Sequence, residues 1–227
     1  MNLLKTGKTK DVYDLENGCY LLQFKDDTTV DEAGNLDPGG NVVGATIAGL
    51  GKASLRVSKH YFEKINAAGM LTHYIDSDLN QATMTVRPAA LIGKGLEVIC
   101  RLKATGSFLR RYGDYCREGQ SLNCLVEVCI KDDGRGDPFI TRDTLAELGL
   151  LNNDEYDAVK AAAVEMAGLI GGDLAGKGLS LYDIKLEFGR IDGKMALVDE
   201  FSWGVMRVYR EGRWLQPFEL SRYFEDR

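Results

Sequence analysis

Near the C-terminal end of the chain, polar and apolar residues alternate in the stretch Tyr182-Asp183-Ile184-Lys185-Leu186-Glu187-Phe188-Gly189. Because successive side chains of a β-strand point to opposite faces of a sheet, the charged residues of this stretch are expected to share one face. A second apolar stretch, Leu197-Val198-Asp199-Glu200, follows an Asp192-Gly193 pair. Asp-Gly between two such stretches favours a tight β-hairpin. The sequence therefore predicts antiparallel strands over Leu179–Phe188 and Met195–Phe201.

The charged face of this hairpin suggests a binding site for a cation. Asp183, Lys185 and Glu187 lie on the first strand, and the second strand brings Asp199 or Glu200 close to them. Three carboxylates around one lysine repel one another unless a further cation lies among them. Mg²⁺ with bound phosphates suits such a cluster, since this ion takes few protein carboxylates and completes its shell with phosphate and water. An amphipathic strand with a solvated polar face shows the same alternation, so the pattern alone leaves both interpretations open.

Apolar patterns elsewhere predict further strands and helices. Strands are expected at Leu3-Leu4, Asp11–Tyr13, Cys19–Phe24, Leu71–Ile75, Ala82–Pro88, Leu96–Leu102 and Leu122–Ile130. Helices are expected at Ala53–Ala68, Thr141–Leu148 and Asn153–Leu174, and a short one from Gln216. The glycine-rich segment Asp31–Gly44 is expected to be a loop.

Strands and helices that do not alternate strictly indicate an α+β fold, not a doubly wound sheet. The glycines of Gly93-Lys94-Gly95 predict a short turn. We place a boundary there between an N-terminal lobe, residues 1–92, and a C-terminal lobe, residues 93–227.

Composition excludes several classes of function. The formal net charge of −6, from 28 Lys and Arg against 34 Asp and Glu, argues against broad nucleic-acid binding. No run reaches the roughly 18 apolar residues of a membrane span, and the first residues lack the apolar core of a signal peptide. Five cysteines, an odd number without a Cys-x-x-Cys pair, predict reduced thiols in a cytoplasmic protein. His60 and His73 lie far apart in sequence, which disfavours a histidine-rich zinc site.

Two basic motifs could bind phosphate or carboxylate groups. In Gly7-Lys8-Thr9-Lys10, a glycine turn exposes backbone N–H groups beside two lysines, although lysine-rich turns are also common on surfaces. In Arg101–Ser107, followed by Arg110-Arg111, arginines beside small residues suit a bidentate grip on an anion. A basic turn at the start of a helix explains the second motif equally well.

Taken in their order along the chain, these segments resemble the SAICAR synthase family (phosphoribosylaminoimidazole-succinocarboxamide synthases). The matching motifs are Gly7–Tyr13, Phe24-Lys25-Asp26-Asp27-Thr28, Thr72-His73-Tyr74, Leu96–Ser107 with Arg110–Gly113, Lys131-Asp132-Asp133, Gly136-Asp137-Pro138, Asp183–Gly189 and Asp199-Glu200-Phe201-Ser202. The resemblance covers the chain from about Leu4 to Tyr223.

The resemblance implies a two-lobed α+β fold with mostly antiparallel sheets and with ATP bound in the cleft between the lobes. It implies an ATP- and Mg²⁺-dependent ligase of purine biosynthesis, which joins 5-amino-4-carboxyimidazole ribotide to the amine of L-aspartate through an acyl phosphate. It also suggests a homodimer. The nucleotide would be bound by Lys8, Lys10, Lys131, Lys185 and Glu187. The metal would be bound by Asp137, Asp183 and Asp199, and the ribotide by Arg101, Ser107 and Arg207. Lys185, Asp199 and Asp183 would be the catalytic residues.

The chain departs from the family pattern at several places. Arg101 is followed by Leu102-Lys103 in place of the family's asparagine and its neighbour. Ser202-Trp203-Gly204 replaces the family's Ser-Pro-Asp, so a carboxylate is missing, and Gly49–Leu55 lacks two asparagines of a family motif. These changes suggest that the substrate half of the site is altered, while the nucleotide half is retained. They leave open a relative that uses the same ATP chemistry on another carboxylate or amine, and a nucleotide-binding relative without activity.

Overall fold

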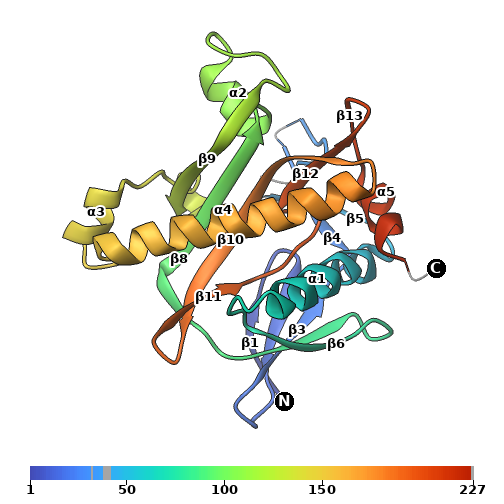
Figure 1. Cartoon of the computed structure of the whole chain (residues 1–227). Helices are drawn as coiled ribbons and strands as arrows, with labels where there is room; N and C mark the ends of the chain where they lie inside the picture. The colour runs from blue at the N-terminus through green and yellow to red at the C-terminus, as the bar shows by residue number, and fades with distance from the viewer. Residues whose placement is uncertain (32, 38–41, 226–227) are drawn as a thin grey trace. The chain divides into compact units, whose positions relative to one another are not determined.

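Antiparallel sheets form the frame of both compact units into which the chain divides (Figure 1). The structure is a computed structural model and describes residues 1–31, 33–37 and 42–225. Unit 1 consists of Met1–Ala89, Glu200–Val205 and Leu215–Arg227, and unit 2 of Ala90–Asp199 and Met206–Trp214. Within the described residues, no helix is long and apolar enough to span a membrane. The sheets and helices confirm the α+β class.

Unit 1 contains a five-stranded sheet with the strand order β1-β2-β3-β7-β6. Its strands are β1 (Asn2–Thr6), β2 (Lys10–Asp14), β3 (Tyr20–Phe24), β7 (Thr83–Val86) and β6 (Tyr74–Asp78). A separate pair consists of β4 (Asp27–Val30) and β5 (Val42–Thr46). Strand β5 corrects part of the predicted loop Asp31–Gly44, because it includes the last three residues of that loop, of which Val42 and Val43 pair with β4. Positions 32 and 38–41 of the loop lie outside the described residues.

Helix α1 (Leu50–Ala67) supplies much of the core of unit 1. Its buried residues Leu55, Phe62 and Ile65 recur at helical spacing, which is why the sequence predicts this helix. It begins three residues earlier than predicted. The Asp26 carboxylate accepts hydrogen bonds from the backbone N–H groups of Gly49 and Gly51, each at 2.9 Å. A carboxylate at this end of a helix is favourable because the first N–H groups have no partner within the helix.

Two late segments of the chain complete unit 1. The Ser58 hydroxyl of α1 donates to the carbonyl of Phe201 at 2.6 Å and accepts from the N–H of Phe201 at 3.1 Å. The Trp203 indole N–H donates to the carbonyl of Leu215 at 2.8 Å. Helix α5 (Pro217–Ser221) then packs on α1, and the 3₁₀ turn η2 (Arg222–Phe224) follows it. These bonds join three separate stretches of sequence in one core.

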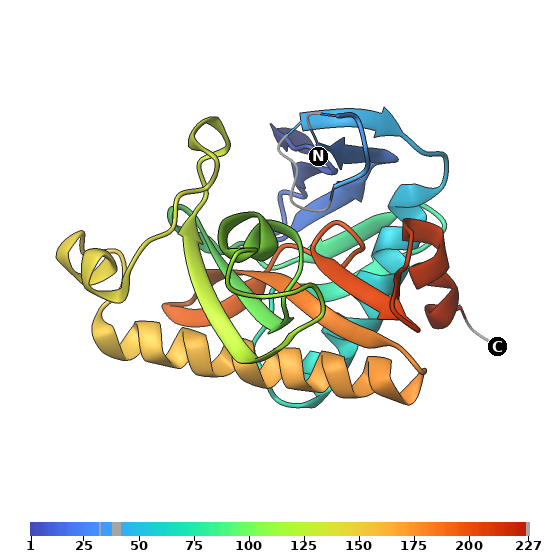
Figure 2. The same ribbon diagram turned by 90° about the horizontal axis from the view of Figure 1, so that it is seen from above.

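Unit 2 contains a six-stranded sheet with the order β13-β12-β10-β8-β9, in which β11 also pairs with β10. Its strands are β8 (Ala90–Lys103), β9 (Ser121–Ile130), β10 (Ser180–Ile191), β11 (Lys194–Val198), β12 (Met206–Arg210) and β13 (Arg213–Trp214). Its helical elements are α2 (Gly106–Tyr112), η1 (Asp133–Arg135), α3 (Arg142–Glu147) and α4 (Asn153–Gly176). Helix α4 packs along one face of this sheet (Figure 2).

The predicted hairpin is confirmed as β10 and β11. Ile191 pairs with Lys194, and both Asp192 and Gly193 between them have positive φ angles, of 49° and 75°. Positive φ at both positions is the geometry for which Asp-Gly is favoured in two-residue hairpins. The pairing of β10 with β8 places Asp183 opposite Arg101 and Glu187 opposite Glu97. Two charged residues of β10 therefore lie opposite charged residues on β8, whereas Lys185 lies opposite Ile99.

The predicted turn at Gly93-Lys94-Gly95 is wrong, because β8 continues through it. Phe188 pairs with Leu96 and Gly189 with Leu91, so residues 92–95 form a bulge without counterparts on β10. Gly93 and Gly95 have φ angles of 59° and 137°, which other residues rarely adopt. Glycines that permit a bulge give the same sequence signal as glycines in a turn.

Candidate functional site

Four alternating charges on the sheet of unit 2 form what we call the charged ring, made of Glu97, Lys131, Lys185 and Glu187. The Lys185 ammonium donates to Glu97 Oε1 at 2.7 Å and lies 3.8 Å from Glu187 Oε1. The Lys131 ammonium donates to Glu187 Oε1 at 2.7 Å and lies 3.7 Å from Glu97 Oε1. Each lysine thus lies between the same two carboxylates. The structure brings together the predicted nucleotide ligands Lys131, Lys185 and Glu187, and adds Glu97.

The charges of the ring shift one another's pKa values. Burial lowers the pKa of Lys185, but the Glu187 and Glu97 carboxylates outweigh this effect and the net shift is upward. The pKa of Lys131 is raised in the same way, by Glu187 and Asp199 against burial. Burial and the nearby Asp199 charge raise the pKa of Glu187. Both lysines therefore carry a charge at neutral pH and present cations that a phosphate group can bind.

Asp199 follows β11 directly and acts on the ring through its charge, as the sequence predicts for Asp199 or Glu200. Its φ angle is 71°, in the left-handed region that non-glycine residues enter at a cost. Asp137 has a φ angle of 49°, and its Oδ1 accepts from the N–H of Asp132 at 2.7 Å. Strained backbone at a polar residue is found most often where function requires it.

The predicted metal ligands Asp137, Asp183 and Asp199 do not form a metal-binding group by themselves. Among the described residues, no three His, Cys, Asp or Glu side chains lie close enough together to hold an ion. Asp183 accepts instead from Arg101 and Arg207, each at 3.0 Å from its Oδ2. A carboxylate held by two guanidinium groups already has its negative charge compensated.

Arg101, Ser107, Arg207, Asp183, Glu127 and Arg111 form what we call the arginine cluster. Arg101 is only 1% exposed, and it donates to Asp183, to Glu127 and, at 3.0 Å, to the Ser107 hydroxyl. Arg111 also donates to Glu127, at 2.6 Å. The structure thus joins all three residues predicted to bind the ribotide. Three arginines against two carboxylates leave an excess positive charge, which favours an anion such as phosphate.

Gly106 opens α2 beside the guanidinium group of Arg207. Its φ angle is +52°, and an added Cβ atom would lie 2.6 Å from Arg207 Cζ. Only glycine lets the backbone approach the guanidinium group this closely.

Because the sequence predicts that Arg207 binds the ribotide, we expect Gly106→Ala to displace Arg207 and to weaken this binding. The Michaelis constant for the ribotide should rise about ten-fold, and unfolding free energy should fall by about 1–2 kcal/mol from the positive φ angle. Gly193→Ala is the matched control, because Gly193 has a φ angle of +75° but nothing within 4 Å of an added Cβ. It should lose similar stability with an unchanged Michaelis constant. Equal kinetic effects in both variants would contradict the contact with Arg207.

The turn Gly7-Lys8-Thr9-Lys10 in unit 1 is closed by a hydrogen bond of 2.8 Å from the N–H of Gly7 to the carbonyl of Lys10. The Lys10 ammonium lies 2.7 Å from Glu200 Oε1, and the Thr9 hydroxyl donates to the same oxygen at 3.2 Å. Lys8 is half-buried in this turn. Glu200 therefore supports the glycine turn of unit 1, while Asp199, its neighbour in sequence, acts on the charged ring of unit 2.

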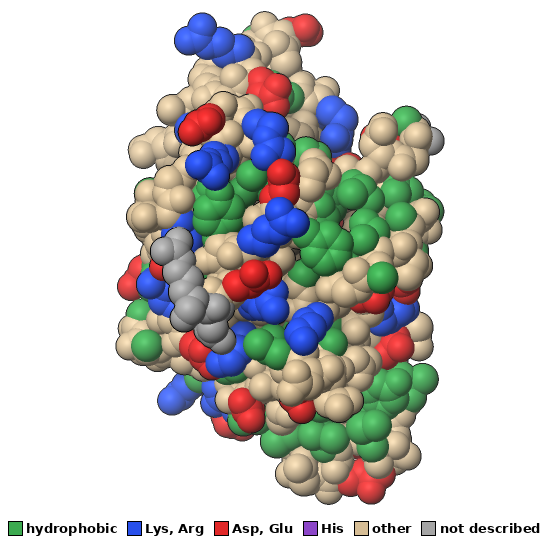
Figure 3. Space-filling model, turned by 90° about the vertical axis from the view of Figure 1, so that its right-hand side faces the viewer, with side chains coloured by type: hydrophobic (Ala, Val, Ile, Leu, Met, Phe, Trp, Pro, Cys, Tyr) green, Lys and Arg blue, Asp and Glu red, His purple; other side chains and the backbone are tan. Residues whose placement is uncertain are grey.

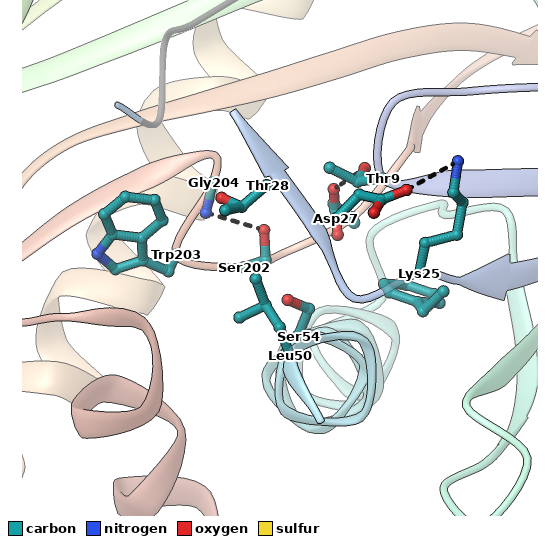
Figure 4. Close-up of a pocket in the computed structure, with 11 residues that line it drawn as sticks. Thr9, Lys25, Asp27, Thr28, Leu50, Ser54, Ser202, Trp203 and Gly204 are labelled. Atoms are coloured by element: carbon teal, nitrogen blue, oxygen red, sulfur yellow. Dashed lines mark hydrogen bonds and ion pairs between the residues drawn. The ribbon is translucent and has the colours of Figure 1, made fainter. Parts of the chain in front are cut away.

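A recess of about 310 Å³, including space open to solvent, lies in unit 1 beside the altered Ser202-Trp203-Gly204 segment (Figure 4). The Gly204 N–H donates to the Ser202 hydroxyl at 3.1 Å, and Lys25 pairs with Asp27 at 3.1 Å. Trp203 is 4% exposed. The bond from the indole N–H to Leu215 therefore holds the segment in place, and Trp203 is one of the residues that line the recess.

The sequence analysis did not predict the ion pairs of Glu97 and Glu127 with candidate site residues. Each is a single charged residue between apolar neighbours on a strand, in Leu96-Glu97-Val98 and Val126-Glu127-Val128. An isolated charge in such a strand predicts a buried ion pair, since an unpaired buried carboxylate is costly. The identity of the partner lysine or arginine required the strand register.

Comparison with known proteins gives a consistent result. The sequence model of the SAICAR synthetase family matches residues 3–219. The chain is 52% identical to the phosphoribosylaminoimidazole-succinocarboxamide synthase of Clostridium tetani, over 98% of both chains. It is 36% identical to the same enzyme of Finegoldia magna, over 92% of this chain and 86% of the relative.

Solved structures agree with this result. The synthase of Ehrlichia chaffeensis has a TM-score of 0.84 at 25% identity, covering 98% of this chain and 90% of its own. A SAICAR synthetase in complex with ADP has a TM-score of 0.83 at 27% identity, covering 96% and 89%. On the matches of both sequence and structure, the chain belongs to the SAICAR synthetase family.

Proposed function

We propose that this protein is a phosphoribosylaminoimidazole-succinocarboxamide synthase of purine biosynthesis. It uses ATP to activate the carboxylate of 5-amino-4-carboxyimidazole ribotide as an acyl phosphate, and the amine of L-aspartate then displaces phosphate to form the amide. The observation that carries the proposal is the 52% identity to the Clostridium tetani synthase over nearly the whole of both chains. The family model matches residues 3–219, so Ser202-Trp203-Gly204 lies within the matched region.

The charged ring and the arginine cluster suit this chemistry. Phosphoryl transfer requires positioning and compensation of charge more than a covalent nucleophile. Lys131 and Lys185 provide two cations for phosphate oxygens, and Glu187 provides a carboxylate that can accept from ribose hydroxyls. Lys8 and Lys10 on the glycine turn remain proposed phosphate ligands in unit 1. A related SAICAR synthetase was solved with ADP, which supports a nucleotide ligand in this family.

The arginine cluster is our proposed site for the anionic groups of the ribotide. Arg101 and Arg207 hold planar guanidinium groups against Asp183, and Ser107 adds a hydroxyl. Guanidinium groups bind phosphate and carboxylate in a bidentate manner. Asp183 fits the role of orienting these arginines, so its proposed catalytic part is to fix the ribotide site.

We also propose that Mg²⁺ accompanies the nucleotide. Mg²⁺ is usually held by one or two carboxylates together with substrate phosphates, so a preformed group of three ligands is not required. Asp199, beside the charged ring, is the best placed of the predicted ligands, with Asp137 as a second candidate. The ion would neutralise charge on the phosphates during transfer. The residues of the chain would bind and orient the nucleotide around it.

The first test is a direct assay. Purified protein is mixed with ATP, Mg²⁺, the ribotide and L-aspartate, and ADP and the succinocarboxamide product are followed together. We expect both to form in equal amounts. Reactions lacking aspartate or the ribotide serve as controls. ADP binding without any succinocarboxamide product would contradict the proposed substrates and would point to another carboxylate or amine.

We further propose that the enzyme acts on small molecules in the cytoplasm, with its five cysteines reduced, and that it forms a homodimer. The structure contains five free thiols. On the face drawn in Figure 3, basic and acidic side chains are interspersed and form no single basic field. Light scattering of the purified protein would test the dimer, for which a monomer mass of 25.1 kDa is the alternative.

A further inference from the structure

Glu97 is the one member of the charged ring to which the sequence assigns no role. It lies on β8 directly opposite Glu187 on β10. Like charges directly opposite on antiparallel strands destabilise a sheet unless cations lie between them. Here the ammonium groups of Lys131 and Lys185 lie between the two carboxylates. The positions of the two glutamates therefore fix the positions of the two lysine ammonium groups.

The Glu97 carboxylate is more deeply buried than the two ammonium groups that it contacts. The Glu97 side chain is 5% exposed, whereas Lys131 and Lys185 are 29% and 28% exposed. A ligand reaching the ring from solvent meets the lysines before it meets Glu97. Glu97 is thus placed to act on a ligand through the lysines.

The distances show what Glu97 contributes. Lys185 is 2.7 Å from Glu97 and 3.8 Å from Glu187, so Glu97 provides its short hydrogen bond. Without the Glu97 charge, Glu187 would attract both ammonium groups to a single carboxylate. The two cations would then lie closer together and repel each other more strongly. Two separated cations match two phosphate oxygens better than a crowded pair.

We propose that Glu97 is a positioning residue for nucleotide binding, which fixes the Lys185 ammonium and keeps it apart from that of Lys131. This rests on the proposed function in that Lys131 and Lys185 bind the phosphates of the nucleotide. Glu97 itself does not touch the nucleotide.

The test is a double-mutant cycle read by ADP binding in calorimetry. Glu97→Gln keeps the shape of the side chain but removes its charge. We expect the dissociation constant for ADP to rise about ten-fold, as for other residues that hold a ligand-binding group in place. In a Lys185→Met background the same change should alter ADP binding less than two-fold, because the group through which Glu97 acts is gone. Glu165→Gln, an exposed position on α4, is the matched control and should leave ADP binding unchanged.

Kinetics separate positioning from general damage to the fold. In Glu97→Gln the Michaelis constant for ATP should rise with the ADP dissociation constant, while that for the ribotide stays within about two-fold. An equal rise for both substrates, or an undiminished effect in the Lys185→Met background, would overturn the proposal. If Glu97→Gln does not fold, Glu97→Asp is tested instead. This change keeps the charge but moves it back by one methylene, and the same double-mutant cycle and criteria apply.

Failure of the proposed function would give a different result from failure of the positioning role of Glu97. If the unaltered protein binds ADP but forms no succinocarboxamide product, the substrates are wrong, and the binding cycle for Glu97 can still be completed. If the product forms and the cycle shows no coupling, the positioning role alone is wrong.

Discussion

Lys185→Met is expected to reduce kcat/KM for the ligase reaction by at least about a thousand-fold, in the range known for a single cation that stabilises phosphoryl transfer. Lys185 is the short hydrogen-bond partner of Glu97 and lies 3.8 Å from Glu187. Its removal leaves Lys131 between these two buried carboxylates. The variant therefore loses a charge proposed to bind phosphate and gains repulsion at the same point. Steady-state kinetics and ADP calorimetry measure the two effects separately.

The control for this prediction is Lys194→Met on β11. Lys194 is exposed at the tip of the same hairpin, far along the strand from the ring. We expect the kinetics and the ADP binding of Lys194→Met to equal those of the unaltered protein. Unchanged turnover in Lys185→Met would remove Lys185 from the catalytic residues.

Arg101→Met should have the largest effect on stability, lowering the free energy of unfolding by about 3 kcal/mol. Arg101 is 1% exposed and holds Asp183, Glu127 and Ser107 at once. Each carboxylate keeps one arginine, Arg207 or Arg111, so the loss stays at the lower end of the range for broken buried ion pairs. The Michaelis constant for the ribotide should rise at least about ten-fold, because a charged hydrogen bond is worth about 1.5–3 kcal/mol.

Urea unfolding and ribotide kinetics test this variant against Arg142→Met. Arg142 pairs with Asp157 at the surface, where the two side chains are 40% and 57% exposed. Removing an exposed pair should cost less than about 1 kcal/mol and leave the kinetics unchanged. Similar losses of unfolding free energy in the two variants would show that the burial of the arginine cluster adds nothing to stability.

The hairpin of β10 and β11 was the most predictable part of the fold. Alternation fixes which side chains share a face, and Asp192-Gly193 fixes the turn, so both features are local. Helix α1 was predictable for the same reason, through the spacing of its apolar residues. The bulge at Gly93–Gly95 was not, since a glycine pair permits a turn or a bulge and the neighbouring strand decides between them.

The sequence indicates which polar residues of β10 share a face, but it does not indicate their partners on other strands. Sequence alternation places Asp183, Lys185 and Glu187 on one face, but their opposite residues depend on the register with β8. That register separates Asp183, which meets Arg101, from Glu187, which meets Glu97. A group that looks like one carboxylate cluster in sequence is therefore divided between an arginine cluster and a charged ring. Long-range pairing of this kind leaves no local signal.

The hydrogen bonds between Ser58 and Phe201 join residues 143 positions apart. During synthesis, the first 89 residues leave the ribosome long before the segments that complete their unit. The apolar face of helix α1 therefore stays uncovered until Phe201, Trp203 and α5 have been synthesised. Such distant contacts slow folding and expose intermediates to aggregation. Cells producing this protein would therefore gain most from chaperones that bind the nascent chain early, and the yield of recombinant protein should depend strongly on growth temperature.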